Sequence, residues 1–175
     1  MLAEGAFQDA TVADVAERAG VSRATLYQHF GSRLGLVDGL CDTLAANPAL
    51  QELRLAVELD SPAAALDEFL DQTVRFWESE EAVHRHLYAL AVLDPAAADF
   101  VTRQRADRRG EVERLARKLH RAKALRSGIS ERQAAVALMV LTSFATYEEL
   151  REIGVAAKSV AAELRRIGRD QMLAL

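Results

Sequence analysis

Residues 11–30, TVADVAERAGVSRATLYQHF, decide how the chain is interpreted, because they predict two short helices joined by a tight turn. Thr11, with Asp14 three residues later, forms a capping box that starts the first helix. Gly20 follows the last residue of the apolar pattern, where helices commonly end in a left-handed residue. Ser22 is suited to cap the second helix. The stretch therefore predicts a helix-turn-helix.

The second helix of the pair has an apolar side and a polar side. Leu26 and Phe30 are four residues apart and are expected to point into a small core. The other side chains are mostly hydrogen-bond formers, namely Ser22, Arg23, Thr25, Tyr27, Gln28 and His29. Arg and Gln recognise guanine and adenine edges with paired hydrogen bonds, and the second helix of such a pair can lie in the major groove. Spacing alone leaves an ordinary helical hairpin with a solvated face equally open.

The segment from Val12 to Arg33, VADVAERAGVSRATLYQHFGSR, closely resembles the DNA-binding segment of the TetR (tetracycline repressor) family of bacterial transcription regulators. The resemblance includes the Gly-Val turn, the Ser-Arg-x-Thr-Leu-Tyr core and the His-Phe ending, and it is ungapped from about Phe7 to Leu40. It implies base contacts by Ser22, Arg23, Ala24 and Gln28, which would set sequence choice. It implies phosphate contacts, which would set register, by Thr11, Thr25, Tyr27, His29, Ser32 and Arg33.

The charge and the start of the chain bear on the expected DNA affinity. Residues 1–40 carry three basic and five acidic side chains, so non-specific attraction to phosphate is expected to be weak. The resemblance implies a basic arm and a full first helix before the motif, and only Met1 to Phe7, MLAEGAF, stand in that place. We expect a truncated first helix, from a gene start set too late, a shortened chain or a natively short protein. DNA binding would be weaker without the missing part.

Length and composition predict an all-α chain with two functional parts. The chain has 175 residues, half of them apolar, with only 3 Pro and 9 Gly, and it lacks runs of alternating β-branched residues. We predict a helix-turn-helix DNA-binding domain with its connecting helix over residues 1–46. A helical effector-binding and dimerisation domain is predicted over residues 47–175. The connecting helix, from Ser32 to about Ala46, is the expected hinge.

Several function classes are disfavoured. A single cysteine, Cys41, rules out an internal disulfide framework and is expected to pack as a small hydrophobe, with a redox switch as the alternative. Apolar runs fall short of the ~20 residues of a membrane span, and the start does not resemble a secretion signal, so we expect a cytoplasmic protein without a membrane partner. Catalytic sets, phosphate loops and metal-ligand spacings do not occur, so we expect no enzyme, cofactor or metal. The adjacent Glu148 and Glu149 are better explained as a solvated helix end than as a catalytic pair.

Further helices are expected after the connecting helix, which Asn47–Pro48 should end. Ser61–Pro62 starts a one-faced helix whose apolar stripe reaches Trp77. The stretch from Ala134 to Tyr147 is apolar nearly all round, so it should be covered on more than one side. The remaining helices are predicted at residues 81–93, 101–126, 130–153 and 156–173.

The resemblance also implies a dimer and an effector site. The last two helices would pair with their copies as a four-helix bundle, with candidate interface residues Val136, Val140, Phe144, Tyr147, Val160, Leu164 and Ile167. A two-fold dimer would let two reading heads recognise a palindrome. Family members hold a small, mostly apolar effector, and the candidate contacts on otherwise apolar faces are Thr73, Trp77, Tyr88, Met139, Thr142 and Thr146. A plain core role explains each of these side chains equally well.

The helix predicted over residues 101–126 is strongly basic. It carries ten Arg or Lys against three acids, a net charge of +7, which leaves −11 for the rest of a chain whose net charge is −4. The simpler interpretation is a solvated face over the stripe of Val112, Leu115 and Leu119. The alternative is a surface for an anionic partner, or for an acidic ligand at the mouth of a pocket.

Together these patterns predict a ligand-responsive transcriptional regulator, by family habit a repressor. It would bind a palindromic operator in double-stranded DNA as a homodimer and be released by an unknown small-molecule effector. The alternative is a helical dimer that binds a ligand or a protein and whose reading head is impaired by the short N-terminus.

Overall fold

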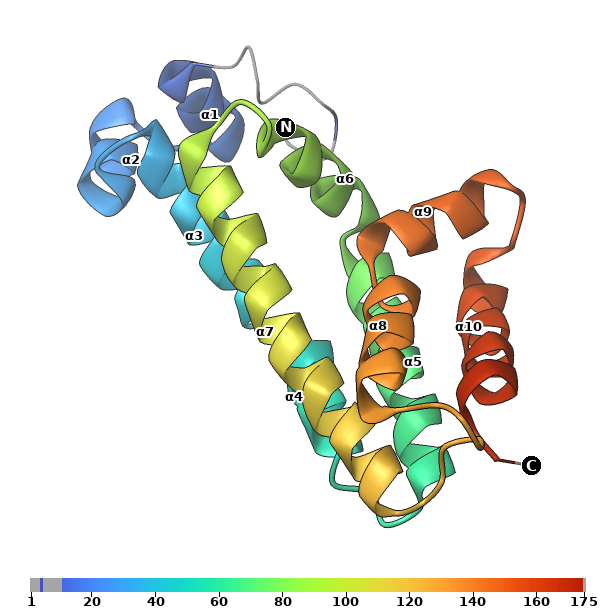
Figure 1. Cartoon of the computed structure of the whole chain (residues 1–175). Coiled ribbons are helices and arrows are strands. Elements are labelled where there is room, and N and C mark those ends of the chain that lie inside the picture. The colour runs from blue at the N-terminus through green and yellow to red at the C-terminus, as the bar shows by residue number, and fades with distance from the viewer. Residues whose placement is uncertain (1–3, 5–10, 175) are drawn as a thin grey trace. The chain divides into compact units, whose positions relative to one another are not determined.

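A computed structural model shows a chain built of α-helices (Figure 1) and describes residue 4 and residues 11–174. This confirms the predicted all-α class. The truncated first helix expected before Thr11 falls largely outside the described residues. The helices are α1 (Val12–Ala19), α2 (Arg23–Phe30), α3 (Arg33–Ala45), α4 (Pro48–Ala56), α5 (Pro62–Ser79), α6 (Glu81–Leu90), α7 (Pro95–Arg121), α8 (Glu131–Leu141), α9 (Phe144–Glu152) and α10 (Ala157–Met172).

The chain divides into two compact units. The first unit contains residues 1–46 and 80–104, and the second unit contains residues 47–79 and 105–175. Helix α6 and the start of α7 therefore belong with the N-terminal helices, although they lie far from them in sequence. Local periodicity carries no information on such long-range grouping, so this arrangement is a finding of the structure.

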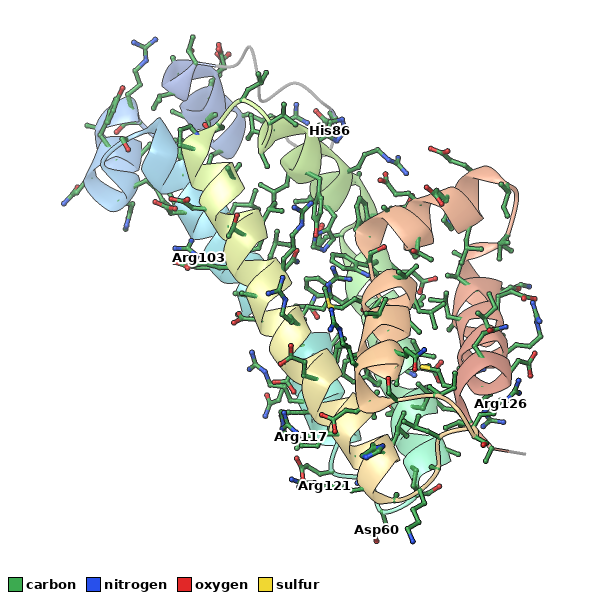
Figure 2. All side chains as sticks on the ribbon, in the orientation of Figure 1. Asp60, His86, Arg103, Arg117, Arg121 and Arg126 are labelled. Atoms are coloured by element: carbon green, nitrogen blue, oxygen red, sulfur yellow. The ribbon has the colours of Figure 1, made fainter. Side chains whose placement is uncertain are left out.

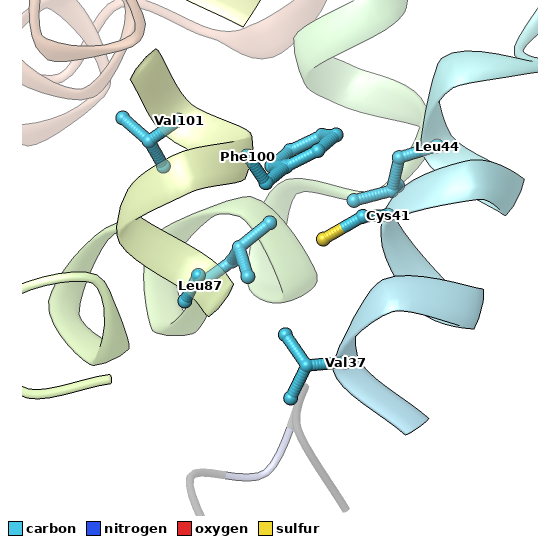
Figure 3. Close-up of a cluster of buried hydrophobic side chains, with 7 residues drawn as sticks. Val37, Cys41, Leu44, Leu87, Phe100 and Val101 are labelled. Carbon is cyan, nitrogen blue, oxygen red and sulfur yellow. The ribbon is translucent and has the colours of Figure 1, made fainter. Parts of the chain in front are cut away.

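The core of the first unit joins α3, α6 and α7 (Figure 3). Its buried side chains are Val37, Cys41, Leu44, Leu87, Ala97, Phe100 and Val101. Cys41 packs there as a small hydrophobe, as predicted, and burial raises the pKa of its thiol to about 11. Since the thiolate is the reactive form, little of this cysteine is in its reactive form near neutral pH.

The second unit is organised around α5, which packs along both α4 and α10. Leu66, Phe69 and Leu70 of α5 are fully buried, as is the α7 stripe of Val112, Leu115 and Leu119. Two arginine–aspartate pairs, Arg165 with Asp71 and Arg169 with Asp67, also join α10 to α5. Their charged groups are partly exposed, so they contribute little beside the apolar contacts.

The single helix expected over residues 130–153 is in fact two helices, α8 and α9. Thr142 ends α8, and its hydroxyl donates to the carbonyl of Leu138 at 2.7 Å. Ser143 then caps α9 by accepting from the amide of Thr146 at 3.0 Å. Hydroxyl groups that bond the local backbone compete with helix continuation, and the apolar pattern concealed this effect.

Helix α4 was not predicted, although its start was marked. Asn47 and Pro48, which were expected only to end the connecting helix, also begin α4, because the Asn47 side chain accepts from the Ala49 amide at 2.9 Å. Proline has no backbone N–H to donate, which ends a preceding helix but costs nothing in the first turn of the next one.

Among the described helices, none is both long and apolar enough to cross a lipid bilayer.

We expect Leu164→Ala to lower the free energy of unfolding by about 2–5 kcal/mol, because a large buried side chain would leave a cavity. Leu164 of α10 is 1% exposed. A matched control is Leu55→Ala on the exposed side of α4, which should change the free energy of unfolding by less than about 0.5 kcal/mol. Urea denaturation followed by circular dichroism measures both. Equal effects of the two variants would contradict the assigned core.

Candidate nucleic-acid interface

Helix α1 begins as the sequence predicts. The backbone amide of Thr11 donates to the Asp14 carboxylate at 2.7 Å, and the amide of Asp14 donates to the Thr11 hydroxyl at 3.3 Å. The hydrogen bonds from Thr11 also lower the pKa of Asp14 below its usual value. A charged Asp14 in the first turn is further favoured by the helix dipole. The capping box therefore fixes the start of the first helix while leaving Thr11 exposed.

The turn between α1 and α2 also follows the prediction. Gly20 adopts a left-handed conformation with φ 68°, and its amide donates to carbonyls of the last turn of α1. Ser22 caps α2 by accepting from the amide of Thr25 at 3.0 Å, and the two hydroxyls lie 2.8 Å apart. Val21, the second residue of the Gly-Val turn, is 42% exposed. The turn is therefore held by backbone and capping hydrogen bonds more than by apolar burial.

Helix α2 presents a bare polar face. Leu26 is its buried side chain, at 4% exposure, and it anchors the opposite side of the helix. Arg23, Ala24, Gln28 and His29 are exposed, and Tyr27 is 50% exposed. Within the part of the chain that the structure describes, the side chains of Arg23 and Gln28 are not occupied by hydrogen bonds to other residues. The predicted base-contacting positions are thus open, on one short helix.

The end of α2 differs from the prediction. Phe30 was expected inside the small core, but 41% of its side chain is exposed. The ring lies over α3, where Gly39 provides space: a Cβ atom there would be 2.7 Å from the ring. Four residues earlier, a Cβ atom at Gly35 would overlap the carbonyl oxygen of Phe30. These two glycines, which weaken helix α3 by their intrinsic propensity, allow α2 and α3 to approach closely.

The predicted phosphate contacts at the start of α3 are only partly described. Ser32 caps α3 by accepting from the amide of Gly35 at 3.1 Å. The Arg33 side chain lies outside the described residues. Arg18 is paired with Glu4, so one of the few cations near the motif is partly neutralised. The geometry suits a groove-reading helix, while the charge supplies little general attraction to DNA.

Three of the predicted effector contacts meet at the break between α8 and α9. The Trp77 indole nitrogen donates to the carbonyl of Thr142 at 3.2 Å. Arg108 donates to the carbonyl of Met139 at 3.0 Å and to the Thr142 hydroxyl at 3.3 Å. Trp77 also packs against Phe144, with ring centroids 5.2 Å apart. Side chains from α5 and α7 thus satisfy backbone groups that the helix break releases.

Arg108 was missed by the sequence analysis, although the sequence contains a signal for it. It lies four residues before Val112 and seven before Leu115, on the stripe of α7 that is buried further along the helix. A cation on an otherwise apolar stripe needs a polar partner nearby. That partner is the C-terminal end of α8, whose carbonyls favour a positive group.

Of the other three predicted effector contacts, Thr146 also lies at this break and two lie elsewhere. Thr146 donates to the carbonyl of Val140 at 2.6 Å, and Thr73 donates to the carbonyl of Phe69 within its own helix at 2.8 Å. Tyr88 belongs to the first unit, where its hydroxyl donates to Gln104 at 2.7 Å. Two surface grooves lie along α5 and α10, and none of the six predicted contacts lines them.

The predicted dimer residues fall into two groups. Phe144, Tyr147, Val160 and Leu164 are at most 2% exposed within the single chain. They are occupied by the chain's own core and have no surface to offer a partner. Val136 and Val140 of α8 are 58% and 59% exposed, and Ile167 of α10 is half-buried. Of the predicted interface residues, the exposed ones are therefore Val136 and Val140, on the outer face of α8.

Comparison with known proteins finds relatives that share the helix-turn-helix segment. Residues 1–40 match the family model described as bacterial regulatory proteins, tetR family. The chain is 36% identical over 93 residues to the HTH-type transcriptional regulator AlkX of Mycobacterium tuberculosis. That match covers 53% of this chain and 37% of AlkX, so it spans well under half of the relative's length.

Solved structures share the fold over nearly the whole chain. The TetR family transcriptional regulator PfmR from Thermus thermophilus superposes with a TM-score of 0.73 at 21% identity, covering 96% of this chain and 92% of PfmR. A transcriptional regulator from Saccharomonospora viridis, solved in complex with choline, gives a TM-score of 0.75 at 16% identity, covering 99% of this chain and 92% of that protein.

Replacing Gly35 by alanine should have two opposed effects on stability, a gain in helix propensity and a steric overlap between α2 and α3. Replacing glycine by alanine inside a helix normally stabilises it by about 1 kcal/mol. For Gly110→Ala in α7, where nothing lies within 4 Å of the new methyl group, we expect that gain. For Gly35→Ala, the overlap with Phe30 should outweigh the gain and lower the free energy of unfolding by about 1–3 kcal/mol.

Urea denaturation of both variants, with amide exchange of residues 23–30 as a local readout, measures the effect. If Gly35→Ala were as stabilising as Gly110→Ala and left exchange of α2 unchanged, the proposed role of the glycine contact would be excluded.

Proposed function

The chain belongs to the TetR family of bacterial regulatory proteins, and from this premise we propose that it is a ligand-responsive transcriptional repressor that acts in the cytoplasm. The family consists of transcription regulators rather than enzymes. The observation that carries the proposal is the bare polar face of α2, set opposite a single buried leucine and held by capping at both helix starts.

We assign two kinds of DNA contact to this face. Ser22, Arg23, Ala24 and Gln28 would meet base edges in the major groove, where Arg and Gln give the most specific hydrogen bonds. The hydroxyls of Tyr27 and Thr25, with the groups of Thr11, His29, Ser32 and Arg33, would hold the phosphate backbone. All of these side chains that the structure describes are exposed or half-buried. A free base-reading face is what operator binding needs.

We propose that two copies pair through the outer face of α8. Val136 and Val140 lie one turn apart there, and exposed branched apolar side chains at this spacing form a compact patch. Such a contact is self-complementary about a two-fold axis. Two reading heads would then meet two half-sites about 34 Å apart, or at a multiple of that distance.

We place the effector in the second unit, near the α8–α9 break. The Trp77 indole lies at this break with the backbone carbonyls of Met139 and Thr142, and an aromatic side chain with a few polar groups is typical of small-molecule sites. The related fold from Saccharomonospora viridis was solved with choline, which supports a small ligand in this architecture. The effector would favour a dimer conformation in which the distance between the two reading heads no longer matches the half-site spacing. It can do so only by binding this conformation more tightly than the DNA-binding one.

Helix α3 is the proposed hinge between these two conformations.

One observation favours a second candidate function. The residues around the motif carry more acids than bases, and Arg18 is paired with Glu4. A head with so little positive charge could be inactive, in which case the chain would be a helical dimer that binds a ligand or a protein. Failure to bind upstream DNA at any salt concentration would select this second function.

Two substitutions on α2 test the DNA-reading proposal. Tyr27→Phe removes a phosphate-binding hydroxyl and should weaken binding to all sequences by roughly tenfold, since a hydrogen bond to a charged group contributes about 1.5 kcal/mol. Arg23→Ala should cost about 1–3 kcal/mol and also reduce discrimination between operator and altered half-sites. Arg75→Ala, an exposed arginine of the second unit, is the control for loss of one charge.

Fluorescence anisotropy with labelled DNA from the region upstream of the gene, at two salt concentrations, measures these affinities. If both α2 variants bound like the parent protein, the assignment of α2 as the reading helix would be wrong.

The dimer proposal is tested by placing charge on the α8 face. Val136→Glu combined with Val140→Glu should shift the protein to monomers in sedimentation equilibrium, because like charges would face each other across the two-fold axis. Leu55→Glu, at another exposed apolar position of the second unit, should leave the dimer intact. A dimer that persisted in the α8 variant would place the interface elsewhere.

A further inference from the structure

The end of α7 and the segment after it carry a cluster of positive charge that the proposed repressor mechanism does not use. We call it the basic end and define it by five residues, Arg117, Lys118, Arg121, Lys123 and Arg126. No acidic residue occurs between Glu113 and Glu131 in the sequence. All five belong to the second unit, and four of them are exposed while Lys118 is half-buried. Figure 2 shows Arg117 and Arg121 on the last turns of α7, and Arg126 on the segment that follows, apart from these two and beside the C-terminal end of α10.

Most of this charge is uncompensated. Arg117 lies 3.7 Å from Glu131, which is its ion-pair partner. For Lys118, Arg121, Lys123 and Arg126, the described part of the chain provides no ion pair and no side-chain hydrogen bond. Asp60 lies at the same end of the unit (Figure 2) and is also exposed. Asp60 by itself does not balance these four cations.

Local structure explains only part of the cluster. Lys118 and Arg121 are in the last turn of α7, where the helix dipole favours cations. Lys123 lies beyond the helix in a left-handed conformation with φ 54°, and Arg126 donates its backbone amide to Met172. The side chains of these last two residues serve no capping role, and an Asn or Gly would suit the φ of Lys123 better. Their positive charge therefore needs another reason.

The shape of the surface favours an extended polyanion over a small ligand or a lipid. The described grooves of the second unit are lined by residues of α5 and α10, not by the basic end. Residues 114–130 contain no exposed large hydrophobic side chain that could insert into a membrane. Unpaired Arg and Lys on an open surface are suited to phosphate groups spaced along a chain.

We propose that the basic end is a second, sequence-independent contact surface for the phosphate backbone of duplex DNA. The choice of DNA as the partner rests on the function proposed above, whereas the positive charge of the basic end is observed independently of that function. The reading head supplies recognition but little positive charge, and the basic end supplies positive charge without base-reading side chains. Each phosphate neutralised by a cation releases counterions and adds about 0.9 to the slope of log affinity against log salt.

The experiment compares two triple variants of the full chain that lose the same net charge. The test variant is Arg121→Gln, Lys123→Asn and Arg126→Gln, with Asn chosen because it tolerates the left-handed φ at residue 123. The control variant is Arg75→Gln, Arg109→Gln and Lys158→Gln, which neutralises exposed cations outside the basic end that lie apart in sequence. Thermal unfolding shows that each variant remains folded. Anisotropy titrations over a series of salt concentrations use a duplex without an operator, with Arg23→Ala present in every protein.

The proposal predicts that the test variant loses about 2 to 3 units of salt slope, because three phosphate contacts are removed. The control variant should keep the slope of the Arg23→Ala parent. Equal slopes in all three proteins, or equal losses in both variants, would overturn the basic end as a DNA surface. Binding of the parent to anionic vesicles or to a polyglutamate peptide, but not to the duplex, would overturn DNA as the partner.

Operator binding by the wild-type chain distinguishes this proposal from the main one. Specific binding with an unchanged slope in the test variant would reject only the basic end. Loss of all sequence preference in the wild type would reject only the reading head.

Discussion

The recognition helix α2 must leave its polar face free of contacts, and that requirement limits how it can be held. In eight residues it buries one side chain, Leu26, while Phe30 covers α3 with much of its ring still in solvent. A single leucine contributes about 1.5–3 kcal/mol of apolar burial, too little to fix a helix in one orientation. The remaining constraint comes from Gly20, the Ser22 and Ser32 caps, and the close approach of α2 to Gly35. Short-range backbone geometry thus holds this helix in place of a large apolar core.

The second unit has the opposite construction. Helix α5 buries side chains on most of its circumference and packs against α4 and α10. The interruption between α8 and α9 is stabilised by Trp77 and Arg108, which donate to carbonyls that the break exposes. At a buried junction of this kind, each exposed carbonyl can accept a hydrogen bond either from a protein side chain or from a ligand. This is why the proposed effector site lies there rather than in the grooves along α5 and α10.

The sequence predicted those features that depend on neighbouring residues. The capping box at Thr11, the left-handed Gly20, the Ser22 cap and the packing of Cys41 as a small buried hydrophobe are all confirmed. Features that depend on residues distant in sequence were not predictable in the same way. The placement of α6 with the N-terminal helices, the exposure of Phe30 and the insertion of Arg108 at the end of α8 each require knowledge of the packing partner. The break at Thr142 is intermediate, because the Thr-Ser pair is visible in the sequence but was outweighed there by the apolar pattern. The residues assigned to DNA, effector and partner contacts remain predictions.

The most direct test of the central claim is a hydroxyl-radical footprint of the protein on DNA from upstream of its own gene. The account predicts two protected patches related by an inverted repeat, with centres separated by about 10 base pairs or a multiple of that number. Arg23→Ala should weaken these two patches relative to diffuse protection at low salt. A uniform or absent pattern with the wild-type protein would contradict the assignment of α2 as a sequence-reading helix.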